Sequence, residues 1–131
     1  LASPKGLVVD GPGNIYVADT NNDRIQKFTF AGAYSAQFGS AGSNNNQFSR
    51  PSGLALDGDG DIWVADTNND RIKAHTAAGA FQTAWGSAGF GTGQLNSPGD
   101  LDFDDSGNVM VADTYNSRIQ IFSAAEPRHA L

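Results

Sequence analysis

The sequence predicts an all-β protein made of repeated units, each with four short antiparallel strands. Three observations lead to this prediction. The segment ADTNNDRI occurs at 18–25 and again at 65–72, and its variant ADTYNSRI occurs at 112–119, so the spacing is 47 residues. Within each unit, runs of β-branched and aromatic residues alternate with turns rich in Gly, Pro, Asn and Asp. No segment has the 3.6-residue apolar period of an amphipathic helix.

The repeat divides the 131 residues into three units. Aligned without a gap, residues 4–50 and 51–97 are identical at 25 of 47 positions. We therefore predict one repeat region over 1–131, with units at 4–50 and 51–97 and an incomplete third unit at 98–131. A period of this length is typical of architectures in which each unit packs on the next.

The strands of the first unit are predicted at 6–10, 15–19, 24–28 and 33–38. The loop between the first two, at 10–14, recurs at 57–61 and 104–108. Its glycines accept positive φ and its Asn and Asp side chains cap their own turn, which predicts a hairpin. In the third unit the outer strand falls at the end of the chain, where Arg128 replaces an aromatic residue. We expect that strand to be weak or to come from another segment.

The motifs resemble the NHL repeat, on the segments PSGLALD at 51–57, GDIWVADT at 60–67, NDRI at 69–72 and GSAG at 86–89. The resemblance implies a β-propeller with four antiparallel strands in each blade and commonly six blades in the ring. Three NHL-type blades then form a half-propeller, which leaves two blade faces uncovered. The chain is either a piece of a longer propeller or a homodimer in which blade 1 of each copy packs on blade 3 of the other. We favour the homodimer.

Composition limits the partners. Eight basic against 14 acidic residues give a net charge of −6, and the pI is about 4.5. Nucleic-acid binding depends on clustered Lys and Arg, so we expect no nucleic-acid partner. No run approaches the ~20 apolar residues of a membrane span, so we expect no membrane partner and a soluble chain. With no cysteine the compartment stays unknown, and an extracellular or periplasmic location is compatible with the sequence.

The most repeated motif pairs an aspartate with an arginine five residues later. A functional interpretation would be a ring of charges at a substrate site. The structural interpretation, which we favour, is a hairpin corner in which the aspartate accepts backbone N–H groups of the turn and the arginine pairs with a carboxylate. These six residues are Asp19, Arg24, Asp66, Arg71, Asp113 and Arg118.

Two acidic residues break the repeat. Asp100 stands where the other units have Gly6 and Gly53, and Asp102 stands where they have a valine and an alanine. They share one face of the innermost strand. They are weak candidates for a metal or a basic ligand near the channel, or they mark a face that meets solvent or a polar dimer seam. The loop DGDGD at 57–61 departs from an EF-hand and predicts a plain turn.

Loops that differ between units are further candidates for binding. Arg50 corresponds to Ser97, and Phe90 lies in a glycine-rich loop where the first unit has asparagines. Because binding residues favour loops on a rigid scaffold, Arg50 and Phe90 join Asp100 and Asp102 as candidate binding residues. Phe90 is either an exposed contact or a loop anchor that folds back.

The candidate functions fall into three classes. The favoured one is a non-catalytic binding or scaffold module for a protein, peptide or other ligand, without a cofactor and with a second copy completing the ring. The second is a hydrolase or lyase that depends on a divalent cation held by Asp100 and Asp102. The third is a repeat protein made for folding or evolution studies, without a native ligand. No nucleophile–histidine set or paired-glutamate arrangement is present, so we lean against an enzyme.

Overall fold

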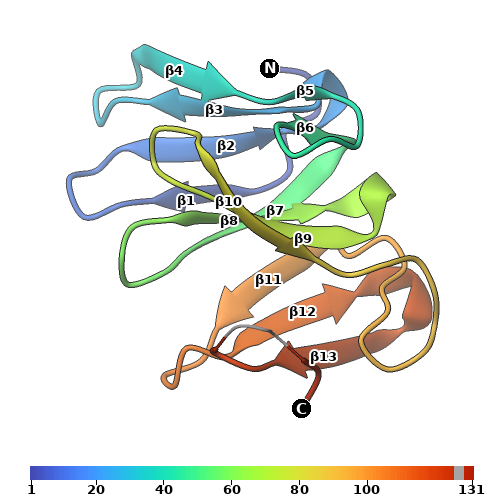
Figure 1. Cartoon of the computed structure of the whole chain (residues 1–131). Coiled ribbons are helices and arrows are strands. Elements are labelled where there is room, and N and C mark those ends of the chain that lie inside the picture. The colour runs from blue at the N-terminus through green and yellow to red at the C-terminus, as the bar shows by residue number, and fades with distance from the viewer. Residues whose placement is uncertain (126–128) are drawn as a thin grey trace.

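Three antiparallel sheets lie side by side in the computed structural model, which describes residues 1–125 and 129–131 (Figure 1). The strand order is β1-β2-β3-β4 in the first sheet, β7-β8-β9-β10 in the second and β11-β12-β13 in the third. Their bounds are β1 Leu7–Val9, β2 Ile15–Asp19, β3 Arg24–Phe28, β4 Tyr34–Phe38, β7 Pro51–Leu56, β8 Ile62–Asp66, β9 Arg71–His75, β10 Phe81–Trp85, β11 Asp100–Phe103, β12 Val109–Asp113 and β13 Arg118–Phe122. The predicted all-β class is confirmed, and the three sheets form an unclosed half-propeller.

The third sheet ends in a fragment of an outer strand. His129 accepts a hydrogen bond at its carbonyl oxygen from the Ser123 N–H, and the Leu131 N–H donates to the carbonyl of Ile121. Ala130 forms an antiparallel bridge with Phe122. The end of the chain therefore pairs with β13 where a fourth strand was expected. Pro127 and Arg128 of that expected strand lie outside the described residues.

Two features lie outside the predicted strands, a turn that recurs in every unit and a strand pair in the first linker. A short 3₁₀ turn follows the second strand of every sheet, at η1 Thr20–Asn22, η2 Thr67–Asn69 and η3 Thr114–Asn116. Each turn is closed by a residue in the left-handed region, with φ of 53–54° at Asp23, Asp70 and Ser117. Asp tolerates that conformation better than most residues. The linker at 39–50 carries the parallel pair β5 Ser40–Ala41 and β6 Gln47–Phe48.

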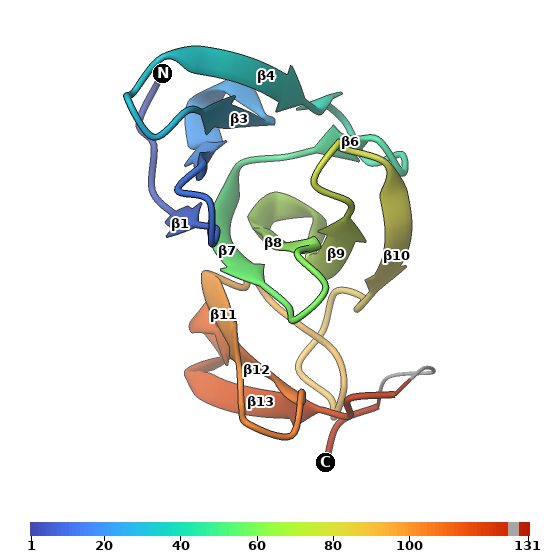
Figure 2. The ribbon, with the colours of Figure 1, turned by 90° about the vertical axis from the view of Figure 1, so that its left-hand side faces the viewer.

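Neighbouring sheets pack face to face through apolar residues, with the first and third sheets on opposite sides of the second (Figure 2). Between the first two sheets the core contains Ile25, Leu54 and Ile62, and Phe48 of the linker fills its edge. Between the second and third sheets it contains Trp63, Ile72, Leu101 and Val111, with Leu95 as the copy of Phe48. Each linker therefore contributes one buried side chain to the junction that it spans.

The outward faces of the first and third sheets lack such cover. Leu7 is 65% exposed, whereas its copies Leu54 and Leu101 are 6% and 5% exposed. On the third sheet Ile119 is 66% exposed, whereas its copy Ile72 is fully buried. The same sequence positions are therefore core residues at the two internal junctions and surface residues at the two open faces. Among the described residues no helix is long and apolar enough to cross a membrane.

Candidate functional site

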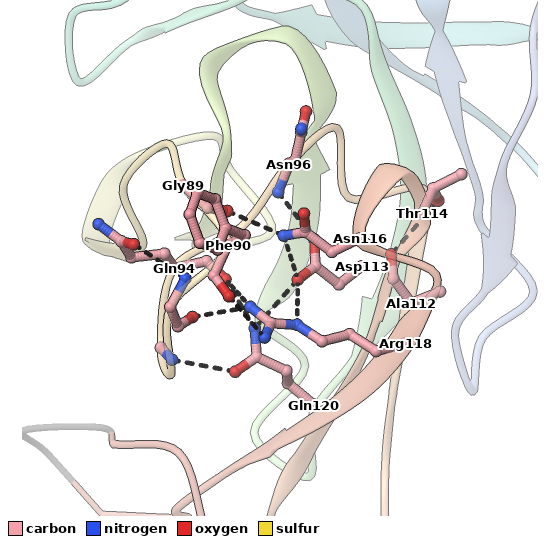
Figure 3. A network of polar contacts seen from close by, with 12 residues as sticks. Gly89, Phe90, Gln94, Asn96, Ala112, Asp113, Thr114, Asn116, Arg118 and Gln120 are labelled. Atoms are coloured by element: carbon pink, nitrogen blue, oxygen red, sulfur yellow. Dashed lines mark hydrogen bonds and ion pairs between the residues drawn. The ribbon is translucent and has the colours of Figure 1, made fainter.

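The repeated Asp–Arg pair anchors the second and third sheets to the linkers that precede them, and Figure 3 shows the pair of the third sheet. In the third sheet Asp113 is fully buried at the end of β12, and its Oδ2 accepts from Arg118 Nε at 2.8 Å. The same oxygen accepts from the side-chain amides of Asn116 and Gln120, and Oδ1 accepts from the Asn96 backbone N–H at 2.7 Å. The backbone N–H that was expected from the turn comes instead from the linker.

The arginine completes the anchor from the other side. Arg118 Nη2 donates to the carbonyl oxygens of Gly91 and Gln94, at 2.7 and 2.8 Å, and its Nη1 donates to the carbonyl of Phe90. Arg71 binds the linker before the second sheet in the same way, through the carbonyls of Ser43, Asn44 and Gln47. The arrangement holds linker and sheet together and leaves the aspartates without access to a substrate.

The hydrogen bonds outweigh the effect of burial on these aspartates. Burial alone would raise the pKa of Asp19, but the Ala2 N–H, Arg24 and Asn22 donate to its carboxylate and lower that pKa to about 2. In Asp113 the pKa is likewise lowered, because four donors together outweigh burial. Both carboxylates are therefore charged throughout the neutral range.

Two cavities are lined by three of the four candidate binding residues, Arg50, Asp100 and Asp102. The channel cavity has a volume of about 670 Å³ and runs along the inner strands. Its lining includes Lys5, Leu54, Asp100, Asp102 and Ile119. A mouth groove of about 360 Å³ is lined by residues next to the 3₁₀ turns, Arg50 and Asp100 among them. The structure thus brings Arg50 together with Asp100, and Asp100 together with Asp102.

The mouth groove also contains an aromatic residue that was not among the predicted site residues. Tyr115 lines this groove and is 75% exposed, and it stands where the other units have Asn21 and Asn68. That exchange within an otherwise repeated turn was the signal that would have found it. Unlike the exposed ring of Tyr115, the side chain of Arg50 is held in place by a hydrogen bond, which its Nη1 donates to Asn21 Oδ1 at 2.7 Å. The groove thus combines a fixed cation, an acid and an aromatic ring.

Phe90 lies away from both cavities. Its side chain is 84% exposed on the linker that packs on the third sheet, while its carbonyl accepts from Arg118 (Figure 3). Of the two alternatives left open for this residue, the structure has the exposed one. Phe90 is available for contact with a partner but not as part of the mouth groove.

The acidic turn at 57–61 forms a compact group. Oxygen atoms of Asp57, Asp59 and Asp61 lie within 4.8 Å of one another. Asp57 Oδ1 accepts from the backbone N–H groups of the other two, and its Oδ2 accepts from Trp63 Nε1 at 2.9 Å. Burial, followed by the charges of Asp57 and Asp59, raises the pKa of Asp61. The contacts are those of a capped hairpin turn.

Two basic side chains, Lys73 and His75, are fully buried at the first junction. Lys73 Nζ donates to the Gln47 carbonyl at 2.7 Å and lies 4.1 Å from the centre of the Phe48 ring. His75 is fully buried against Phe38 and Phe48, and its Nε2 has no hydrogen-bond partner in the described part of the chain. Burial lowers the pKa of Lys73 to about 8 and that of His75 to about 4.

Replacing Lys73 by glutamine is expected to stabilise the protein at pH 7. The other units have Gln26 and Gln120 at this position, and both amides donate to the buried aspartate of their sheet. Because the pKa of Lys73 is about 8 when folded and ordinarily about 10.5, burying the charged form costs up to about 3 kcal/mol below pH 8. We expect Lys73→Gln to raise the free energy of unfolding at pH 7 by about 1–3 kcal/mol. Urea unfolding at pH 7 and pH 9.5 checks this, since the wild type should gain stability toward high pH and the variant should not.

Comparison with known proteins relates this arrangement to a repeat family. The family model described as NHL repeat matches residues 1–28, 48–74 and 95–122, which together make up more than half of the chain. Protein brain tumor of Drosophila melanogaster is 43% identical over 47 residues, which cover 36% of this chain and 4% of that protein. This chain therefore spans only a small part of that relative.

Solved structures resemble the fold closely. A streptogramin B lyase structure superposes with a TM-score of 0.76 at 19% identity, covering 98% of this chain and 40% of the lyase. A catalytically inactive virginiamycin B lyase from Staphylococcus aureus with quinupristin gives a TM-score of 0.76 at 18% identity, covering all of this chain and 41% of that one. At such identities the likeness concerns the fold alone, and this chain spans about two fifths of each lyase.

Proposed function

The chain belongs to the NHL-repeat family, and from that premise we propose that it is a non-catalytic binding module whose ring of blades is completed by a second copy of the chain. The observation that carries the proposal is the contrast between equivalent positions. Leu7 and Ile119 are exposed on the open faces, while their copies at 54 and 72 are buried at an internal junction. Apolar faces of repeat units need a neighbouring unit or a cap.

The two open faces match each other as the internal faces do. The first sheet presents Leu7, Val9 and Tyr34, which are 65%, 54% and 58% exposed. The third sheet presents Ile119 and Ile121, together with Met110 in the channel cavity. Around a two-fold axis, the open face that carries Ile119 in one copy meets the open face that carries Leu7 in the other copy. The symmetry forms both junctions at once. Closure of this kind removes all exposed blade faces.

The binding surface in this proposal is the mouth groove, and Phe90 offers a separate exposed contact on the linker before the third sheet. Arg50 offers a positive charge, and Tyr115 offers an exposed aromatic ring. Such a mixture suits a polar peptide segment of a protein partner, because aromatic and Arg side chains contribute most of the affinity at protein interfaces.

The assembly is tested by the mass of the full chain in solution. Light scattering should give twice 13.7 kDa, and Ile119→Asp should give the mass of one chain. Phe90→Ser is the matched control, because it also removes an exposed apolar side chain but lies outside the open faces. A folded wild-type monomer that persists at high concentration contradicts the proposal, as does an Ile119→Asp variant that remains dimeric.

The rival function is a hydrolase or lyase with a divalent cation at Asp100 and Asp102. Each of these carboxylates accepts the backbone N–H of the residue that follows it, at 2.9 and 2.8 Å. A thermal-shift scan with Ca²⁺ and Zn²⁺ separates the two functions. A binding module gives no shift that depends on these residues, whereas stabilisation that disappears in Asp102→Asn would support the cation-dependent enzyme and contradict the binding module.

A further inference from the structure

At the two internal junctions, the inner strands of neighbouring sheets pass each other at a glycine. A Cβ atom at Gly6 would overlap the carbonyl oxygen of Ser52, and a Cβ atom at Gly53 would lie 2.6 Å from the Cα of Asp100. Both positions therefore exclude any side chain, and they mark where the first strand of the next unit approaches most closely.

The third copy of this position is Asp100, whose Cα and Oδ1 both lie 2.6 Å from a Cβ atom built at Gly53, and on its other side no further sheet follows in the described part of the chain. Following the repeat around a closed ring, the residues that Asp100 meets are the copies of Ser52 and Gly53 in a second chain, namely Lys5 and Gly6. Among the three copies at 6, 53 and 100, only Asp100 is charged. Among the three copies at 5, 52 and 99, only Lys5 is charged, and its charge is opposite.

We propose that each ring-closing junction contains an ion pair between Asp100 of one copy and Lys5 of the partner subunit. The inference rests on the proposed ring of two chains and names the contact that distinguishes its junctions from the internal ones. Lys5 is exposed, and both residues line the channel cavity. Within the part of the chain that the structure describes, the ion pairs shorter than 4 Å all belong to the Asp–Arg anchors, so Lys5 and Asp100 are free to pair between chains.

The ion pair replaces a contact that Asp100 makes impossible. A Cβ atom does not fit at Gly6 in the first junction. At the junction between two chains Asp100 takes the place of that glycine, so the two inner strands must stand further apart there. The lysine side chain at position 5 is long enough to span this extra space. The equivalent residues of the other two units, Ser52 and Gly99, are too short to do so. Asp102 lies on the same face two residues further along and adds a second negative charge toward the partner subunit.

A hydrogen bond that is incomplete in one chain supports the same junction. Thr20 Oγ1 donates to the Pro51 carbonyl and Thr67 Oγ1 donates to the Pro98 carbonyl, both at 2.8 Å across an internal junction. Thr114, the third copy, reaches only the carbonyl of Ala112 in its own sheet, at 3.5 Å. In the closed ring its next acceptor is the carbonyl of Pro4 of the partner subunit, one residue before Lys5.

Charge reversal tests the ion pair in the full chain. We expect Lys5→Asp to weaken dimerisation at least about tenfold in sedimentation equilibrium, because it places like charges together at both junctions. The double variant Lys5→Asp with Asp100→Lys should restore most of the affinity. The wild-type dimer should weaken as salt approaches about 1 M, where the Debye length is about 3 Å. Circular dichroism of every variant checks that the sheets are intact.

Asp100→Gly is the matched control, since it restores the residue found at 6 and 53. This variant should still dimerise through the apolar faces, but its dissociation constant should rise less steeply with salt than that of the wild type. A wild-type dimer that responds neither to Lys5→Asp nor to salt overturns the ion pair and leaves the ring of two chains standing. A wild-type monomer overturns both proposals.

Discussion

Replacing Asp113 by alanine is expected to lower the free energy of unfolding by about 3–5 kcal/mol, the range for breaking a buried ion pair. Asp113 is fully buried and accepts from Arg118, Asn116, Gln120 and the Asn96 backbone N–H. Its removal leaves these donors without their acceptor, and it frees the linker that closes the second junction. Urea unfolding followed by circular dichroism at pH 7 measures the loss.

Asp105→Ala is the control for this experiment. Asp105 is exposed in the turn between β11 and β12, and its removal should change stability by less than about 0.5 kcal/mol. If Asp113→Ala cost no more than this control, the repeated aspartate would not be a structural anchor, and its recurrence in every unit would need a functional explanation.

Acidification from pH 6.5 to pH 4 is expected to destabilise the protein by up to about 3 kcal/mol through His75 alone. Burial lowers the pKa of His75 to about 4, below the ordinary value of 6.5. Between these values the unfolded chain binds a proton that the folded chain does not, so stability falls as the pH falls. The effect is complete near pH 4 and absent above about pH 7.

His75→Phe should remove this pH dependence, because Phe28 and Phe122 occupy the same position in the other sheets. We expect the variant to lose much less stability than the wild type between pH 7 and pH 4.5 in urea unfolding. His129→Gln, which changes the exposed histidine, should keep the wild-type dependence. Equal losses in wild type and His75→Phe would mean that His75 is not buried in the neutral form.

The sequence predicted the fold well because the repeat supplied three copies of every strand and turn. Predicted strands at 15–19 and 24–28 coincide with β2 and β3, since Gly, Asn and Asp bound them on both sides. The 3₁₀ turns were not predicted, because the repeated motif carries the same polar residues that a plain hairpin turn would. Nor did the sequence reveal that each aspartate accepts a backbone N–H from the segment that precedes its sheet. Donor and acceptor are 17 residues apart, and only the folded sheet brings them together.

The candidate site was predicted only where the repeat is broken. Asp100 and Arg50 stood out because their copies are uncharged, and both line the mouth groove. Tyr115 broke the repeat equally and was overlooked within an otherwise familiar turn. The burial of Lys73 had no sequence signal, because it depends on Phe48 of the preceding linker covering it, whereas the phenylalanines at 28 and 122 did indicate a packing position for His75.

Cysteine cross-linking tests most directly the claim that the open faces of two copies meet. The chain has no cysteine, so a variant with Lys5→Cys and Asp100→Cys carries only the two thiols under test. A disulfide forms only when the two Cα atoms are within about 7 Å. Oxidation of the double variant should give a covalent dimer on a non-reducing gel, while each single variant should stay uncross-linked. A monomer, or a ladder of longer chains in the double variant, would contradict the closed ring.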